Sequence, residues 1–255
     1  MGRFSAIGYE PHAGAGLITY RRPERRNALS VGMYREIVEA VEAANADPNV
    51  RAIVITNEGP VFSAGVDLKA PPEPKDPETG HRPNLGSLSM AEDASWLHLM
   101  ARSKPVIGAI NGPAIGAGAT HALAMDIRLA SDDASFAFPF VRIGYLPEIG
   151  CTGLLPRLIG HGRALALCLS GGSLSAAEAL ACGLVSGVFP KTNLLPAALD
   201  LAGRLSTYDP HALRLTKALI TENGAESDVN ALLGRERDAF AALYRARRAA
   251  PAGAG

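Results

Sequence analysis

The sequence predicts an α/β fold with a strand-and-helix core followed by a helical C-terminal region. Short apolar or β-branched runs alternate with amphipathic helical segments over residues 1–190, whereas the pattern over residues 191–255 is helical. Two of the apolar runs lead directly into glycine-rich turns. Alternation of strands and helices is typical of a sheet that is covered by helices. We therefore expect a core domain over the first range and a helical region over the second.

Composition restricts the class of protein. The chain has 255 residues, of which 47% are hydrophobic and 20% charged, so it contains enough apolar material for a sizeable core. Its 25 basic and 25 acidic side chains balance, which gives no reason to expect a nucleic acid or a membrane as a partner. Three scattered cysteines form no CxxC pair, so we expect neither a metal site nor a disulfide framework. The N-terminal segment lacks the apolar core of a signal peptide, which favours the cytoplasm.

Turn and cap signals define the first elements. A strand is expected at residues 17–20, and a segment with four arginines, RRPERR, follows at residues 21–26. Ser30 is suited to cap a helix whose apolar side chains recur on one face, and the β-branched run at residues 50–56 is the clearest strand of the chain. The arginines can form either a solvated loop or a clamp for a phosphorylated ligand, since guanidinium groups pair well with phosphate oxygens.

Two glycine-rich corners follow predicted strands. The first is FSAGVDL at residues 62–68, and the second lies within residues 104–125, where an apolar run passes through NGPAIGAG into an alanine-rich segment. Backbone N–H groups at such a corner lack a partner inside the helix, so they can bind an anion or a developing oxyanion. The alternative is that the corners only pack helix on sheet. His121 stands where a dinucleotide-binding fingerprint has its last glycine, so a Rossmann site is not supported.

The remaining elements follow from the same signals. The proline-rich segment at residues 70–90 is expected to form a mobile loop, and the helix after it directs Trp96 and Met100 toward the core or a pocket wall. The elements expected beyond it are short strands at residues 127–130, 136–138 and 184–189, a loop entering a helix at 144–160, a helix with a capping box at Ser175, and C-terminal helices broken near Asp209 and Asn223.

Four segments resemble the enoyl-CoA hydratase/isomerase family, also called the crotonase family. The resemblance covers residues 5–220 and implies a right-handed spiral of strand-strand-helix turns with a helical C-terminal region that forms trimers, often paired into hexamers. The chain is expected to be shortened at its C-terminus, because it ends soon after Arg248 where relatives continue with a further helix. The four segments are RRPERRNALS at 21–30, FSAGVDL at 62–68, NGPAIGAG at 111–118 and LPEIGCTGLLPRLIG at 146–160.

The same resemblance implies a ligand and a site. The ligand is an acyl-CoA thioester, and because coenzyme A is part of the substrate, no separate cofactor is expected. The backbone N–H groups of Val66 and Ala117 correspond to the pair that stabilises a thioester enolate in the family. Asp67 is implied to lie near the nucleotide, and it is expected to fix its turn rather than to act as a base. The residues implied to contact substrate or coenzyme A are Arg25, Arg26, Ala28, Ala64, Asp67, Leu68, Gly116 and Phe140.

The chain departs from the family at the positions of the catalytic glutamates. Hydratases of the family carry two glutamates, and the corresponding positions here hold Thr120 and Phe140, neither of which can act as a carboxylate base. One carboxylate is placed by motif, that of Glu148, where relatives that shift an enoyl-CoA double bond from position 3 to position 2 carry their single acid. We expect Glu148 to move a proton from C2 to C4, with Phe140, Leu146 and Ile149 raising its pKa.

Other functions stay open from the sequence. A hydratase that uses Glu148 alone, a non-catalytic acyl-CoA binder and a protein-interaction module are all compatible with the missing acids, and Glu148 itself can be an ordinary surface residue of a loop. His121 is expected to pack its helix or to face solvent. No histidine is visibly paired with Cys151, so we do not expect a thiol nucleophile.

Overall fold

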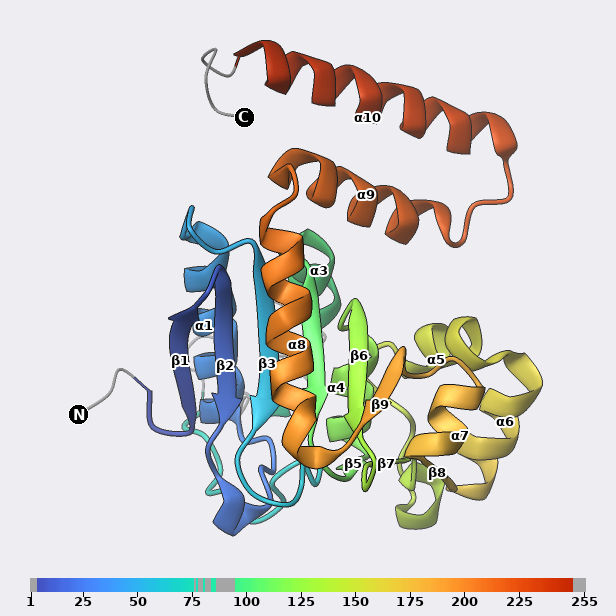
Figure 1. Cartoon of the computed structure of the whole chain (residues 1–255). Helices are drawn as coiled ribbons and strands as arrows, with labels where there is room; N and C mark the ends of the chain where they lie inside the picture. The colour runs from blue at the N-terminus through green and yellow to red at the C-terminus, as the bar shows by residue number, and fades with distance from the viewer. Residues whose placement is uncertain (1–3, 76, 78–79, 81–83, 86–94, 250–255) are drawn as a thin grey trace.

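The computed structural model describes residues 4–75, 77, 80, 84–85 and 95–249, and within them the chain forms a central sheet of six strands (Figure 1). The first two strands are antiparallel, and every later neighbour in the sheet is parallel. In spatial order the strands are β1 (Ile7–His12), β2 (Ala15–Tyr20), β3 (Ala52–Asn57), β4 (Val106–Ile110), β6 (Ile127–Ser131) and β9 (Gly187–Phe189). Parallel strands place their carboxyl ends at one edge of the sheet, which is where the two glycine corners begin.

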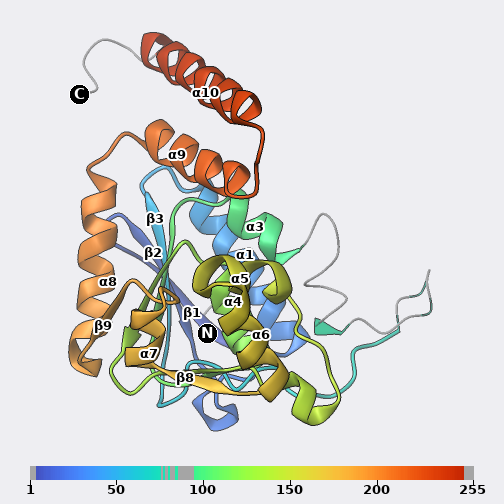
Figure 2. The same ribbon diagram turned by 90° about the vertical axis from the view of Figure 1, so that its right-hand side faces the viewer.

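Helices cover both faces of the sheet (Figure 2). One face packs on α1 (Val31–Ala46), α3 (Trp96–Arg102) and α4 (Ala117–Leu123), and the other packs on α8 (Lys191–Ser206). Strand β3 shows why the sheet must be buried on both faces, because Ile53 and Ile55 point into one core and Val54 into the other. A strand buried on both sides is apolar throughout, which is the pattern that the sequence shows there.

A smaller layer lies beside the carboxyl edge of the sheet. Three short strands form a second sheet, and three helices with the 3-10 turn η2 (Phe140–Ile143) pack around it (Figure 1). The predicted capping box is present, with the Ser175 hydroxyl accepting from the Glu178 N–H and the Glu178 carboxylate accepting from the Ser175 N–H. The elements are β5 (Ala114–Ile115), β7 (Ser135–Ala137), β8 (Ser173–Ser175), α5 (Cys151–Ile159), α6 (His161–Ser170) and α7 (Ala176–Ala181).

The C-terminal region is helical, as predicted. Helix α9 (Pro210–Asn223) and helix α10 (Val229–Ala249) form an antiparallel pair, with α10 lying along α9 on the side away from the sheet (Figure 1). None of the described helices is both long and apolar enough to cross a membrane. The loop predicted at residues 70–90 lies partly outside the described ranges, and its described part at residues 71–75 has no regular secondary structure.

Candidate active site

The two glycine corners lie side by side. They follow β3 and β4, which are parallel neighbours, so both corners start at the same edge of the sheet. The Ile115 N–H donates to the Ser63 carbonyl at 2.9 Å, and the Phe62 N–H donates to the Pro113 carbonyl at 3.0 Å. Ser63 and Ala114 also form a parallel β-bridge. Main-chain hydrogen bonds of this kind fix the distance between the two corners independently of their side chains.

Glycine allows the corners to approach closely. A Cβ atom at Gly118 would lie 2.5 Å from the Ser63 carbonyl oxygen, which no ordinary packing tolerates. A Cβ at Gly65, whose φ is +90°, would lie 2.8 Å from the Ile115 carbonyl oxygen and 3.4 Å from the Ala117 amide nitrogen. The first corner therefore contacts the second at the residue where α4 begins.

This contact brings two backbone donors to neighbouring positions. Val66 follows Gly65, and Ala117 follows Gly116, which has a φ of 54° and open space where a Cβ would stand. Among the described residues, no acceptor is hydrogen-bonded to the N–H of Val66 or to that of Ala117. Unpaired main-chain donors next to open space can bind an oxygen that carries negative charge.

The arginine-rich segment is tied to the first corner. The Leu29 N–H donates to the Gly65 carbonyl at 2.7 Å, and the Asp67 N–H donates to the Leu29 carbonyl at 2.9 Å. Arg22 donates to Asp67 Oδ2 at 2.8 Å, and burial would raise the pKa of Asp67, but hydrogen bonds from Arg22 and the Lys69 N–H hold it below its ordinary value. Asp67 is therefore bonded within its turn and stays ionised.

Sequence reasoning missed two residues of this segment, Arg22 and Asn27. Asn27 is fully buried, and its amide group donates to the Glu58 and Val61 carbonyls while its Oδ1 accepts from the Arg22 N–H. Its own carbonyl accepts from the Ser63 hydroxyl at 2.9 Å. An asparagine flanked by arginines gives no signal of burial in the sequence, because the two carbonyls that accept from its amide group lie more than thirty positions away.

The residues predicted to contact substrate or coenzyme A differ in their exposure to solvent. Arg25, Arg26 and Leu68 are exposed beside the corners, so their side chains are free to meet a ligand from solvent. Ala28 is buried, and the Ala64 N–H donates to the Arg26 carbonyl at 3.0 Å, so these two positions shape the backbone.

Helix α4 carries two polar side chains that point into the protein. The Thr120 hydroxyl donates to the Ala117 carbonyl at 3.2 Å and is fully buried, so it cannot work as a base. The His121 ring packs against Trp96 at a tilt of 47° with the centroids 3.7 Å apart, and its Nε2 lies 3.3 Å from the Tyr20 hydroxyl. Burial lowers the pKa of His121 to about 3, so the ring is neutral and packs the helix, one of the two roles expected for it.

Glu148 lies in a constrained loop before α5. Its side chain is half-buried, and burial raises its pKa above the ordinary value. Ile149 has a φ of 54° and Gly150 a φ of 70°, and a Cβ at Gly150 would lie 2.4 Å from Leu97 of α3. A β-branched residue in the left-handed region is a strained backbone of the kind that clusters at functional sites. Helix α5, which begins three residues after Glu148, packs against α4.

The expected apolar surroundings of Glu148 need one correction. Phe140 and Ile149 are buried at 5% and 1% exposure, as expected, whereas Leu146 is 81% exposed and cannot shield the carboxylate from water.

The Cys151 thiol is buried, which raises its pKa to about 12 and keeps it protonated. Within the described ranges, no three His, Cys, Asp or Glu side chains are grouped so that they could hold a metal ion.

Comparisons with known proteins identify the family of the chain. The model of the family described as enoyl-CoA hydratase/isomerase matches residues 10–248. A 2,3-dehydroadipyl-CoA hydratase of Escherichia coli is 35% identical over 89% of this chain and 86% of its own, and a 1,2-epoxyphenylacetyl-CoA isomerase of the same organism is 37% identical over 88% and 85%. The crystal structure of an enoyl-CoA hydratase subunit I from Geobacillus kaustophilus superimposes with a TM-score of 0.83 at 34% identity, covering 96% of this chain and 91% of that one. The chain therefore belongs to the enoyl-CoA hydratase/isomerase family, whose members are enzymes of acyl-CoA thioesters.

Proposed function

We propose that this enzyme shifts the double bond of a 3-enoyl-CoA to position 2, with Glu148 as its single acid and base. The observation that carries the proposal is the half-buried carboxyl of Glu148, whose pKa is raised by burial, in a strained loop beside α5. The residues at the two positions where hydratases of the family carry glutamates also support it. The Thr120 hydroxyl is bonded inside α4, and Phe140 is apolar and buried. One carboxylate is sufficient for this reaction, since the proton that it removes is the proton that it returns.

The proposed mechanism has two proton transfers. The Glu148 carboxylate takes a proton from C2, the electron pair of that C–H bond moves toward the thioester carbonyl, and negative charge develops on its oxygen. The N–H groups of Val66 and Ala117 bind this oxygen, which stabilises the enolate more than the substrate. The enolate then takes the proton back from Glu148 at C4, and the double bond moves to C2–C3. Removal of one donor from an oxyanion hole typically costs about 3 kcal/mol of transition-state stabilisation.

Coenzyme A binding is assigned to the arginine-rich segment and the first corner. The exposed side chains of Arg25 and Arg26 can pair with phosphate oxygens, because arginine presents two parallel donors. The nucleotide would then lie against Ala28, Asp67 and Leu68. Ala64, Gly116 and Phe140 would line the path from the nucleotide to the thioester. Coenzyme A enters as part of the substrate, and the proposal includes no further cofactor.

The second candidate is an enoyl-CoA hydratase in which Glu148 alone handles water. It is favoured by the Escherichia coli relative named 2,3-dehydroadipyl-CoA hydratase, whereas the relative named 1,2-epoxyphenylacetyl-CoA isomerase favours an isomerisation without hydration. A chain that only binds acyl-CoA is the third. Product analysis separates them, because a hydratase forms a 3-hydroxyacyl-CoA from a 2-enoyl-CoA and a binder changes no enoyl-CoA.

The test is the variant Glu148→Gln assayed with 3-enoyl-CoA. Glutamine keeps the size of the side chain and removes the carboxylate, so we expect kcat to fall at least about 100-fold while acyl-CoA affinity is retained. The matched control is Glu222→Gln, an exposed residue of α9, which should keep the wild-type rate. Unchanged turnover in Glu148→Gln would exclude the assigned role. A 3-hydroxyacyl-CoA product from the wild-type protein would favour the hydratase.

We also propose that the protein is cytoplasmic and forms a homotrimer or homohexamer. The exposed apolar side chains of α10 support the assembly, because they stay in water although the helix packs on α9.

A further inference from the structure

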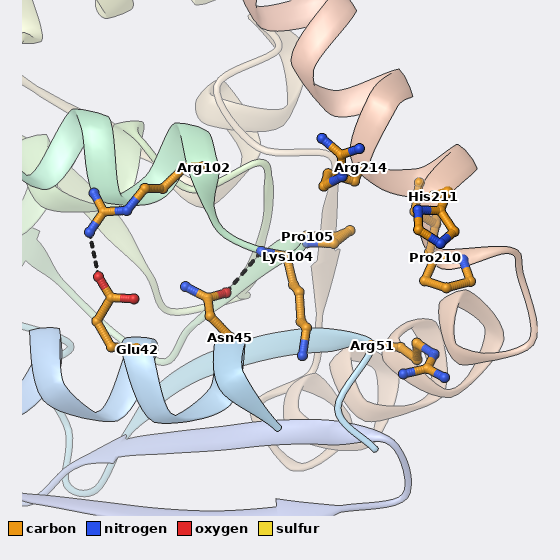
Figure 3. Close-up of a pocket in the computed structure, with 10 residues that line it drawn as sticks. Glu42, Asn45, Arg51, Arg102, Lys104, Pro105, Pro210, His211 and Arg214 are labelled. Atoms are coloured by element: carbon orange, nitrogen blue, oxygen red, sulfur yellow. Dashed lines mark hydrogen bonds and ion pairs between the residues drawn. The ribbon is translucent and has the colours of Figure 1, made fainter. Parts of the chain in front are cut away.

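A cavity of about 420 Å³ opens at the end of the sheet opposite to the two glycine corners (Figure 3). Arg51 comes directly before β3, and Lys104 and Pro105 come directly before β4, whereas the corners follow the other ends of these strands. With five or six residues per strand, the cavity is separated from the candidate active site by about 17–20 Å. It is therefore a second site and not an extension of the first.

The cavity is lined by an excess of positive charge. Three arginines and one lysine line it, and the carboxylate of Glu42 is bonded to only one of them, Arg102. Among the described residues, no carboxylate lies within ion-pair distance of Arg51, Lys104 or Arg214. The whole chain has a formal net charge of zero, so this excess is a local property of the cavity and not a consequence of a basic protein.

Lys104 is anchored in the wall of the cavity. Its ammonium group donates to the carbonyls of Ala44 and Asp47 at 2.8 and 2.6 Å, at the end of α1, which leaves one N–H free. Burial and the neighbouring charge of Arg51 both lower the pKa of Lys104, against a smaller opposing effect of the Asp47 carboxylate. Two cations that repel each other inside a cavity are stabilised by an anion placed between them.

The cations come from three different parts of the fold. Arg51 precedes β3, Lys104 precedes β4, and Arg214 lies one turn into α9 with His211 beside it (Figure 3). Donors from separate elements can surround a tetrahedral phosphate, and arginine matches its oxygens in pairs. The volume lies in the range of small-molecule sites and is larger than a single inorganic ion requires.

We propose that this cavity binds a small phosphate-bearing molecule through Arg51, Lys104 and Arg214, at the same time as acyl-CoA occupies the active site. The phosphate neutralises the three unpaired cations, and the rest of the molecule fills the remaining volume toward Pro210. Because the two sites lie at opposite ends of β3 and β4, neither ligand blocks the other.

The test is calorimetric titration of the full chain with pyrophosphate. The double variant Arg51→Gln/Arg214→Gln should bind it at least about tenfold more weakly than wild type, since two charge-assisted contacts are lost. The control, Arg163→Gln/Arg204→Gln, removes the same charge from exposed positions on α6 and α8 and should bind like wild type. The variant Arg51→Lys/Arg214→Lys keeps the charge and should recover part of the affinity, which excludes misfolding as the cause.

Two further measurements distinguish a second site from binding in the active site and from a contact between copies of the chain. Titration in the presence of saturating acyl-CoA should give the same affinity, since any phosphate contacts of the active site are then occupied; loss of pyrophosphate binding there would overturn the second site. No saturable binding to wild type, or equal weakening in the control, would overturn it as well. If the pocket variants change the sedimentation coefficient and leave pyrophosphate affinity unchanged, the cations belong to a contact between copies of the chain and the proposal is wrong.

Discussion

At the scale of single residues, the role proposed for the Glu148 carboxylate predicts that activity falls as the pH is lowered. Its carboxylate must be ionised to remove a proton, and burial raises its pKa above the ordinary value of 4.5. As the pH falls, kcat/KM on 3-enoyl-CoA should therefore decrease tenfold per unit below that raised pKa. The measurement is a pH–rate profile with two acyl-CoA substrates, which controls for ionisation of the substrate. A rate that stays constant down to pH 4.5 would contradict the assignment.

The buried ring of His121 leads to a second prediction at this scale, on how the free energy of unfolding depends on pH. Its ring is fully enclosed, no described residue pairs with its Nδ1, and its pKa in the folded state is about 3 against an ordinary value of 6.5. The unfolded chain then binds the proton more tightly, so the free energy of unfolding should fall by about 1.4 kcal/mol per pH unit as the pH falls from 6.5 toward 3.

Denaturation in urea at several pH values measures this slope. Replacing the histidine, His121→Leu, should remove its part of the slope, because leucine does not titrate. The control His161→Leu changes an exposed histidine at the start of α6 and should keep the wild-type slope. Equal slopes in all three proteins would show that His121 does not titrate differently in the folded and unfolded states.

At the scale of elements, the contact between the two corners depends on glycine at one helical position. A Cβ at Gly118 of α4 would lie 2.5 Å from the Ser63 carbonyl oxygen, whereas a Cβ at Gly153 of α5 would meet no atom within 4 Å. The substitution Gly118→Ala should therefore destabilise the protein by about 1–3 kcal/mol and lower kcat, since the corner that carries Val66 must move.

The matched substitution Gly153→Ala should have the opposite effect. Alanine favours the helix by about 0.5–1 kcal/mol over glycine, and no atom stands in its way, so the denaturation midpoint should rise slightly while turnover is unchanged. Both midpoints are read from chemical denaturation, and both rates from the 3-enoyl-CoA assay. A Gly118→Ala protein as stable and active as Gly153→Ala would show that the corners are not in tight contact.

At the scale of the whole molecule, α10 leaves a row of apolar side chains in water. They recur on one face of the helix, and a contiguous apolar surface of this kind marks a contact with another protein. The residues are Val229, Leu233, Phe240 and Tyr244, each more than half exposed. Because the helix packs on α9 by another face, we expect this row to bind further copies of the chain.

Sedimentation velocity tests the proposed assembly. The double variant Phe240→Asp/Tyr244→Asp places two charges in the row and should sediment as a smaller species than wild type. The control Ala241→Asp places one charge at an exposed position of the same helix outside the row and should sediment like wild type. A wild-type protein that sediments as a monomer would contradict the proposed trimer or hexamer.

Much of the fold could be predicted from local sequence. The helix capped by Ser30, the β-branched strand β3 and the capping box at Ser175 all occur as expected, because each signal lies within a few residues of its effect. Strands β1, β5 and β8 were not predicted. β5 is two residues long and β8 three, and both form only because a neighbouring segment supplies hydrogen bonds.

The sequence by itself determined the capped helices and the longer core strands, the place of the glycine corners and, through the four segments, the family to which the chain belongs. Only the tertiary structure decided which polar groups are buried and which charges meet. Arg22 contacts Asp67 across 45 positions, and the cavity collects Arg51, Lys104 and Arg214 from three separate elements. The physical reason is that capping and backbone preference act over a few residues, whereas desolvation and charge pairing depend on segments that only folding brings together.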